Sequence, residues 1–263
     1  MQNEKNIISQ RPLILVANDD GVEARGIRHL ATLASRYGDV IIAAPLSPQS
    51  GMSSALTVGE PLYINKYPDL SENVKVYSVS GTPVDCVKLA MHAIVPSRPD
   101  LILSGINHGS NAAVNNIYSG TMGAAMEGCL IGIPSVGFSL LSHDPEARLD
   151  QCDPIICHII DSVLTKGLPE GLCLNVNFPK EVIPAGVKVV RAAKGYWTEE
   201  YADFVTPYGR TSYWLTGRFH NEEPDCPETD EYWLARGYAS VVPIRPDQTA
   251  TDSIDTIKEV LGS

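Results

Sequence analysis

A continuous apolar run that ends in two carboxylates constrains the fold more than any other stretch of this chain. Residues 13–17 read Leu-Ile-Leu-Val-Ala, and Asn18, Asp19, Asp20 and Gly21 follow directly. Five apolar residues without a polar break are typical of a strand buried on both faces, which in an α/β protein is a central parallel strand. Ligands of open α/β sheets bind beyond the carboxyl ends of such strands, so the two aspartates are expected at a ligand site.

The two adjacent aspartates indicate what kind of ligand this site takes. Gly21 permits a turn that aims Asp19 and Asp20 at one point. Two carboxylates ~4 Å apart repel by about 4 kcal/mol at an effective dielectric constant of about 20, so such a pair favours a cation or a shared proton. Because oxygen ligands suit Mg²⁺ and Mn²⁺, a divalent cation site is predicted. A turn with solvated aspartates is the alternative that this stretch alone leaves open.

Strand patterns alternate with helix patterns through the first two thirds of the chain. Short apolar or alternating runs predict strands at 40–44, 74–79, 100–104, 134–138 and 172–177. Apolar residues at helical spacing predict helices at 26–37, 83–93, 122–131 and 155–164. This order predicts the α/β class, with a Rossmann-like, doubly wound and mostly parallel sheet. Residues 52–72 match neither pattern.

The character of the sequence changes after about residue 180. Residues 196–238 hold eleven of the chain's eighteen aromatic residues, together with prolines and charges. Strand patterns at 213–215 and 232–234 bracket a polar loop, which predicts a C-terminal β-hairpin arm. The aromatic side chains of this arm are expected to pack at an interface, to stack on a base or to form the arm's own small core.

These patterns divide the chain into four segments. Residues 1–11 form a disordered tail and residues 12–195 an α/β catalytic core, while residues 196–238 form an aromatic-rich arm and residues 239–263 a return strand with a closing helix. A two-stranded hairpin alone in water is only marginally stable, so the arm needs a partner surface. Another copy of the chain is the simplest partner. We therefore predict a homo-oligomer, a dimer or a tetramer, with Trp214 or Trp233 at or near a subunit contact.

Composition excludes several classes of partner. The formal net charge of the 263 residues is −11, which argues against duplex nucleic acid. None of the six cysteines is spaced C-x-x-C, and several lie in apolar runs, which fits free thiols in a reducing cytosol. The longest apolar runs fall short of the 18 residues of a membrane span. A soluble cytoplasmic protein without a membrane partner is expected.

Three polar loops follow three of the predicted strands and carry candidate metal ligands. Besides Asp19 and Asp20, these loops contain Ser50 and Asn107. Because the carboxyl ends of parallel strands meet at one edge of a sheet, the four residues are expected to converge there. Two carboxylates, a hydroxyl and an amide oxygen would form an all-oxygen shell with positions left open for catalysis. Ordinary turn chemistry is the alternative for Ser50 and for Asn107.

A predicted helix start lies close to this shell. Ser119, Gly120 and Thr121 open a helix rich in small residues, and the free backbone N–H groups of a helix start favour an anion. A metal beside an anion site suggests phosphate chemistry, although Ser119 also fits an ordinary helix cap. His108 adjoins the site and is a candidate acid or base.

Several of these stretches together resemble the SurE family (survival protein E) of metal-dependent nucleoside monophosphate phosphatases. The resembling segments are 18–22 (NDDGV), 50–51 (SG), 80–87 (SGTPVDCV), 104–107 (SGIN), 118–121 (YSGT) and 124–128 (AAMEG). In order and spacing they cover roughly residues 12–140, and the agreement continues more weakly to the end. Residues 46–49 read Leu-Ser-Pro-Gln, where many relatives have charged residues. The resemblance therefore does not define the substrate contacts of that loop.

The resemblance implies a Rossmann-like core, an extended hairpin used in oligomerisation, and release of phosphate from nucleoside 5′- and often 3′-monophosphates with Mg²⁺ or Mn²⁺. By position, Asp19, Asp20, Ser50 and Asn107 match the family's metal ligands. We expect one divalent ion per subunit.

The predicted function is that of a 5′-nucleotidase. Asp19, Asp20 and Asn107 are the expected catalytic residues, while residues 119–121 are expected to bind the phosphate. One alternative is a haloacid-dehalogenase-like phosphatase with an aspartate nucleophile, but such enzymes separate their two aspartates by one residue. The other is a non-catalytic nucleotide-binding module. The sequence contains neither a G-x-G-x-x-G motif nor a P-loop lysine, which argues against binding of a dinucleotide or a triphosphate.

Overall fold

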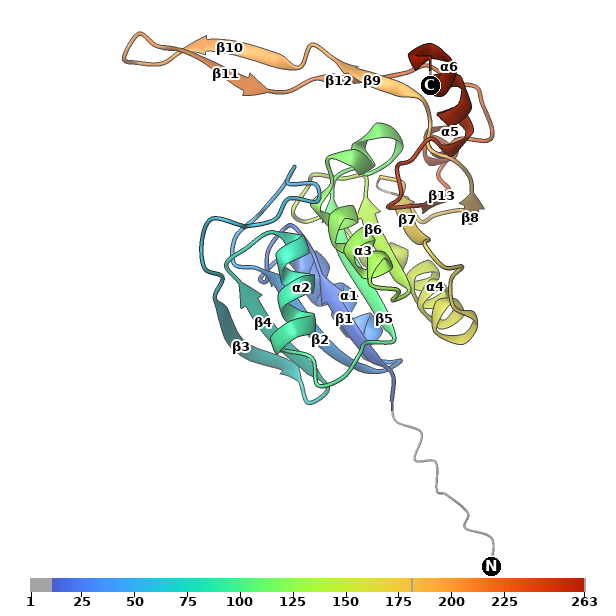
Figure 1. The fold of residues 1–263 in the computed structure, drawn as a ribbon. Coiled ribbons are helices and arrows are strands. Elements are labelled where there is room, and N and C mark those ends of the chain that lie inside the picture. The colour runs from blue at the N-terminus through green and yellow to red at the C-terminus, as the bar shows by residue number, and fades with distance from the viewer. Residues whose placement is uncertain (1–10, 181, 263) are drawn as a thin grey trace, which may run out of the picture.

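A central sheet with helices on both faces organises the chain (Figure 1). The computed structural model describes residues 11–180 and 182–262, so the predicted tail lies, apart from Arg11, outside the described residues. Within that part the main sheet has nine strands in the order β3-β4-β2-β1-β5-β6-β7-β13-β8. In chain order they are β1 (Leu13–Ala17), β2 (Asp39–Pro45), β3 (Ile64–Ser71), β4 (Val74–Val79), β5 (Leu101–His108), β6 (Ser135–Leu140), β7 (Cys173–Phe178), β8 (Val187–Val189) and β13 (Ala239–Ile244).

The direction of the strands confirms the predicted mostly parallel sheet. Strands β4, β2, β1, β5, β6 and β7 run parallel to one another. At the two ends of this set, β3 pairs antiparallel with β4, and β13 pairs antiparallel with β7. From β1 the chain proceeds through β2 to the edge strand β3, turns back into β4 between them, and then crosses to β5 on the opposite side of β1. The crevice at such a reversal of strand order is where ligands bind in doubly wound sheets.

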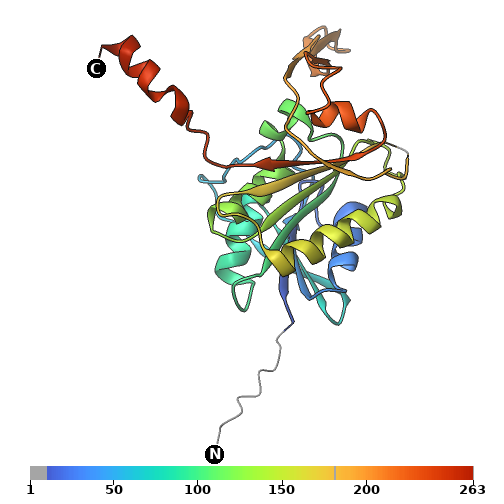
Figure 2. The same cartoon turned by 90° about the vertical axis from the view of Figure 1, so that its right-hand side faces the viewer.

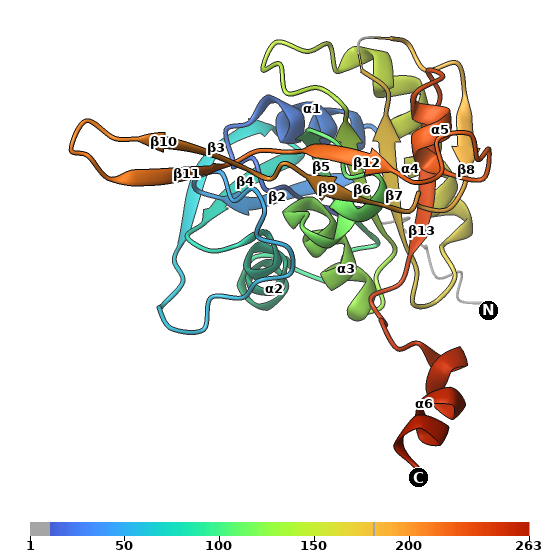
Figure 3. The same cartoon turned by 90° about the horizontal axis from the view of Figure 1, so that it is seen from above.

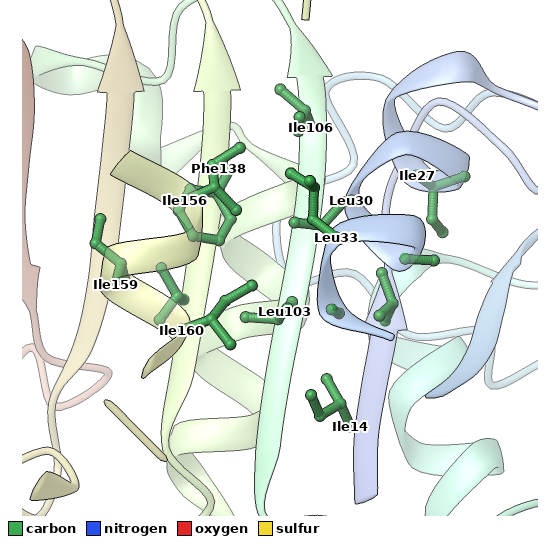
Figure 4. Packing of buried hydrophobic residues seen from close by; sticks show 14 of the residues in the cluster. Ile14, Ile27, Leu30, Leu33, Leu103, Ile106, Phe138, Ile156, Ile159 and Ile160 are labelled. Atoms are coloured by element: carbon green, nitrogen blue, oxygen red, sulfur yellow. The ribbon is translucent and has the colours of Figure 1, made fainter. Parts of the chain in front are cut away.

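Helices cover the two faces of the sheet in pairs (Figure 2, Figure 3). Their bounds are α1 (Arg25–Ala34), α2 (Pro83–Ala93), α3 (Gly120–Leu130), α4 (Asp153–Lys166), α5 (Asp230–Leu234) and α6 (Ile254–Leu261). Helices α1 and α4 pack on one face, and α2 and α3 pack on the other. Figure 4 shows the first of these layers, with Ile27, Leu30 and Leu33 from α1 and Ile156, Ile159 and Ile160 from α4.

The apolar run at residues 13–17 forms strand β1 at the centre of this core. All five residues of β1 are buried, as predicted, and β1 lies between β2 and β5. Burying one Ile or Leu side chain contributes roughly 1.5–3 kcal/mol, so the two layers around β1 hold the strand ends in fixed positions. Gly26 of α1 is part of this packing: a Cβ there would lie 2.0 Å from the carbonyl oxygen of Ile106, so only glycine lets α1 approach β5 this closely.

Three local expectations are corrected by the structure. Strand β5 continues to His108 instead of ending at residue 104, with a register shift against β6 between Ser104 and Asn107 that the sequence pattern does not reveal. Residues 64–71, which matched no pattern, form the antiparallel edge strand β3. Residues 232–234 belong to helix α5 and not to a strand, because three residues are too few to distinguish the two periodicities.

The predicted arm contains two short antiparallel ladders. Strands β9 (Gly195–Thr198) and β12 (Arg218–Asn221) pair next to the main body, and β10 (Tyr201–Val205) and β11 (Thr211–Leu215) pair further out. Together they extend over the edge of the sheet in Figure 1 and Figure 3, whereas α6 projects away from the body in Figure 2. None of the helices in residues 11–180 and 182–262 combines the length and apolarity needed to cross a membrane.

Candidate active site

The structure places Asp19 and Asp20 at the reversal of strand order, directly after β1. Asp19 is buried, with 4% of its surface exposed, and its Oδ1 accepts a 2.5 Å hydrogen bond from the hydroxyl of Thr121. The carboxylate of Asp20 accepts a hydrogen bond from the backbone N–H of His108 at 3.3 Å. The backbone oxygen of Asp19 accepts one from the N–H of Gln49 at 2.7 Å. The three predicted loops are therefore tied together around these two aspartates.

Both carboxylates are held in an environment that disfavours their charge. Burial raises the pKa of Asp19 to about 6, against the lowering effect of hydrogen bonding from Thr121 and with a further increase from the neighbouring Asp20. Burial also raises the pKa of Asp20, while the N–H of His108 and the nearby His143 act in the opposite direction. Within the described residues neither carboxylate forms an ion pair with a lysine or arginine. A bound cation would supply the missing positive charge.

Ser50 and Asn107 lie in two segments that contact these aspartates, Ser50 in the loop after β2 and Asn107 near the end of β5. Ser50 is exposed and follows Gln49, the residue that bonds the backbone of Asp19. The side-chain nitrogen of Asn107 donates to the carbonyl oxygen of Gly109 at 3.0 Å, so its side-chain oxygen is the atom available as a ligand. Three of the four predicted ligands thus lie on loops that follow β1 and β2, and Asn107 lies near the carboxyl end of β5.

The start of α3 lies against Asp19. A Cβ on Gly120 would be 2.9 Å from the Cβ of Asp19 and 3.1 Å from its Oδ2, so only glycine allows this approach. The hydroxyl of Ser119 accepts a hydrogen bond from the N–H of Met122 at 3.0 Å and therefore caps the helix. The Thr121 hydroxyl donates its proton to Asp19, whereas the Ser119 hydroxyl only accepts. This helix start therefore offers an anion the Ser119 O–H together with its backbone N–H groups and its dipole.

The donor set fits a hard divalent cation. Among the described residues no three His, Cys, Asp or Glu side chains gather as they would around zinc. Two carboxylates supplemented by an amide oxygen and a hydroxyl are oxygen donors of the kind that Mg²⁺ and Mn²⁺ take, commonly with water in the remaining positions.

His143 is a neighbour of the site that the sequence analysis missed. It follows β6, and a Cβ on Gly109 would lie 2.6 Å from the Cε1 of its ring. The adjoining His108 has a buried Nδ1 without a hydrogen-bond partner in the described residues, and burial lowers its pKa, so its ring favours the neutral form. A polar loop after β6 was the only sequence signal for His143, and its contact with Gly109 depends on the register of the two strands.

Together, these features define an α/β protein of the doubly wound class with an acidic, cation-compatible site beside a helix N-terminus. Comparisons with known proteins extend this assignment. The family described as "Survival protein SurE" matches residues 14–199. A protein named "5'-nucleotidase SurE" from Flavobacterium psychrophilum is 49% identical over 249 residues, which are 94% of this chain and 96% of the relative. One of the same name from Bacteroides fragilis is 45% identical over 252 residues, 95% of this chain and 98% of the relative.

A solved structure agrees with these relatives. The crystal structure of the SurE protein from Aquifex aeolicus has a TM-score of 0.81 and 34% identity, and the match covers 95% of this chain and 100% of that one. The chain belongs to the SurE family.

Proposed function

We propose that this protein is a metal-dependent 5′-nucleotidase that hydrolyses nucleoside 5′-monophosphates to a nucleoside and phosphate. The observation that carries the proposal is the contact of Asp19 with the start of α3, because it puts an oxygen-donor site beside a helix N-terminus, whose dipole and backbone N–H groups favour an anion. Hydrolysis of a phosphate monoester uses both features: a metal held by the oxygen donors polarises one phosphoryl oxygen, and the helix N-terminus binds the other phosphoryl oxygens. The names of the relatives from Flavobacterium psychrophilum and Bacteroides fragilis support the same activity.

The roles of the residues follow from their positions. Asp19, Asp20, Ser50 and Asn107 would hold one Mg²⁺ or Mn²⁺ per subunit, which when bound supplies positive charge that polarises a phosphoryl oxygen. The backbone N–H groups of residues 119–121 orient the other phosphoryl oxygens and stabilise the charge that develops on them. One of the two aspartates orients the attacking water. We extend the proposal to nucleoside 3′-monophosphates as further substrates.

Two other functions are less well supported. In a haloacid-dehalogenase-like phosphatase an aspartate would attack the phosphate, but here the two aspartates adjoin and Asp19 is buried against Thr121. A non-catalytic nucleotide-binding module has no use for Asp19 and Asp20, because two carboxylates that lack an ion pair with a lysine or arginine would repel an anionic nucleotide. Trapping of an aspartyl-phosphate would favour the former, and nucleotide binding without phosphate release would favour the latter.

We infer that the protein forms a homo-oligomer through the arm. Trp214 of β11 is 70% exposed, and Tyr208 at the outer turn is 93% exposed. The apolar residues of α6, among them Ile257 and Val260, are exposed as well. Large exposed apolar surfaces are characteristic of protein contacts, and a second copy of the chain would cover them.

A cytoplasmic location is part of the proposal. The structure describes all six cysteines as free thiols, four of them buried. Free thiols in this number fit a reducing compartment.

Phosphate release from a panel of nucleotides tests the proposed activity. The panel contains the 5′- and 3′-monophosphates of each nucleoside, with ribose 5-phosphate as the control that lacks a base, each assayed with Mg²⁺ and with Mn²⁺. We expect phosphate from the nucleoside 5′-monophosphates, with weaker release from the control. No release from any nucleotide under either metal would overturn the proposal.

A further inference from the structure

The loop that carries Ser50 connects β2 to β3 without regular secondary structure. Exposed and half-buried residues alternate over residues 52–58 of this loop, and the half-buried ones there are Ser53, Ala55 and Thr57. These three residues make the hydrogen bonds that join the loop to two helix starts. Since the loop has no ladder of its own, its position depends on these bonds.

The first anchor is the segment that leads into α3. The hydroxyl of Ser53 donates to the carbonyl oxygen of Ile117 at 2.6 Å, and its backbone N–H donates to that of Tyr118 at 3.1 Å. The loop also runs close to α3 itself, because a Cβ on Gly123 would lie 2.2 Å from the carbonyl oxygen of Ser53. This anchor fixes the loop beside the predicted phosphate site.

The second anchor is Asp85 in the first turn of α2. Its two carboxylate oxygens accept hydrogen bonds from the backbone N–H of Thr57 at 3.3 and 3.2 Å. Oδ2 also accepts the N–H of Thr82 at 3.0 Å, and the Thr82 hydroxyl donates to the carbonyl oxygen of Ala55 at 2.7 Å. Asp85 is buried, with 4% of its surface exposed, so little water can replace these partners.

Helix capping alone does not account for this arrangement. A capping box needs only the reciprocal bonds between Thr82 and Asp85, which are both present. The bonds to Thr57 come in addition, and they reach 28 residues along the chain. Gly81 leaves the space for the carboxylate, because a Cβ there would lie 2.6 Å from Oδ2 of Asp85. The motif S-G-T-P-V-D at residues 80–85 therefore builds a receptor for the loop as well as a helix start.

We propose that Asp85 is a positioning residue that holds the Ser50 loop at the active site. The inference rests on the proposed function, in which Ser50 is one of the oxygen donors. Asp85 acts through the amide of Thr57 and has no contact with the reacting atoms. Without its carboxylate the loop keeps the bond from Gln49 to Asp19 and the anchor at Ser53 but loses the bonds at Thr57, so the segment that carries Ser50 is held less rigidly.

Three variants test this role. Asp85→Ala removes the anchor and half of the capping box. Asp85→Asn keeps one acceptor oxygen, and it serves as the second variant if Asp85→Ala does not fold. Val87→Ala is the matched control, because Val87 is buried in the same helix and packs in the core without a hydrogen bond to the loop. For each variant we would measure amide hydrogen exchange of residues 50–57, calorimetric binding of Mn²⁺, and KM and kcat for a nucleoside 5′-monophosphate.

The expected pattern separates positioning from stability. Asp85→Ala should raise the exchange rate of the Thr57 amide about tenfold and weaken Mn²⁺ binding by up to about tenfold, with Asp85→Asn intermediate. Val87→Ala should lower the melting temperature but keep wild-type exchange in the loop. Loop exchange and Mn²⁺ binding in both Asp85 variants equal to those of Val87→Ala would overturn the inference.

The same experiment distinguishes this inference from the proposed function. A wild-type protein that releases no phosphate contradicts the proposed function, and exchange at Thr57 then decides whether Asp85 anchors the loop. An active wild-type protein whose Asp85→Ala variant keeps normal exchange, KM and Mn²⁺ affinity contradicts only the inference about Asp85.

Discussion

The buried carboxylate of Asp19 is held by hydrogen bonding, and its most direct partner comes from a different element. The hydroxyl of Thr121, 102 residues further along the chain, donates to Oδ1 of Asp19 and lowers its pKa against the effect of burial. This bond keeps Oδ1 in one orientation. It also leaves the Thr121 hydroxyl unavailable as a donor to the phosphate, so the Thr121 side chain acts on the site through Asp19.

Thr121→Val tests this role because it removes the hydroxyl and keeps the shape of the side chain. We expect kcat/KM to fall about 10–100-fold, as happens when the partner of a metal ligand is lost, while the fold remains intact. The measurement is steady-state phosphate release together with the melting temperature. If activity per folded molecule equals that of the wild type, the hydrogen bond has no part in the site.

At this scale the sequence predicts candidate ligands better than it predicts their partners. Asp19, Asp20 and Asn107 could be grouped because residues that follow parallel strands meet at one sheet edge. Their roles as ligands stay predictions. The bond from Thr121 and the position of His143 could not be foreseen, since both depend on how a helix start or a loop packs against a strand distant in sequence.

Helix α5 is the element where the sequence pattern misleads. Its first residue, Asp230, is completely buried and accepts hydrogen bonds from the backbone N–H groups of Ala113, Ala193 and Glu231. Two distant segments are thereby joined to α5 at one carboxylate, and this tertiary arrangement forms a helix where aromatic residues alone predict a strand. In contrast, the sequence predicts the starts of α2 and α3 well, because Thr82, Pro83 and Ser119 are local capping signals.

Glu231 of the same helix gives the fold a pH dependence that can be measured. Burial, with a smaller contribution from Asp230, raises its pKa from 4.5 to about 7. The folded protein therefore favours the protonated form, and the stability that this provides is present below about pH 4.5 and is lost as the pH rises through 7. Above that range the buried charge costs on the order of 2 kcal/mol.

Glu231→Gln removes this titration. We expect the variant to be more stable than the wild type in urea at pH 8, by on the order of 2 kcal/mol, and about equally stable at pH 4.5. Glu222→Gln, at an exposed position, is the control and should leave stability unchanged at both values. An equal difference between Glu231→Gln and the wild type at pH 4.5 and pH 8 would contradict the raised pKa.

At the scale of the whole molecule, two parts leave apolar surface uncovered. The outer ladder of the arm carries Trp214 with 70% of its surface exposed, and α6 projects from the body without a buried residue (Figure 2). The other candidate contact residue of the arm, Trp233, packs within its own chain against Tyr238, and its indole N–H donates to the carbonyl oxygen of Pro227. Trp214 is therefore the better residue for a test of assembly.

Trp214→Ser is expected to shift the protein toward smaller assemblies, because it removes an aromatic anchor of the proposed contact. Val58→Ser changes a residue that is similarly exposed but lies outside the arm, and it should leave the assembly unchanged. Multi-angle light scattering at micromolar concentration measures the mass of each. A wild-type protein that is already monomeric there would refute the oligomer.

The dependence of phosphate release on metal tests the central claim most directly. Wild-type protein and Asp19→Asn would be assayed on a nucleoside 5′-monophosphate after exhaustive chelation and again after addition of Mg²⁺ or Mn²⁺. We predict that chelation abolishes the wild-type activity, that either metal restores it, and that Asp19→Asn stays at least about tenfold slower with metal present. Full activity of the chelated wild-type protein, or wild-type rates in Asp19→Asn, would contradict the account.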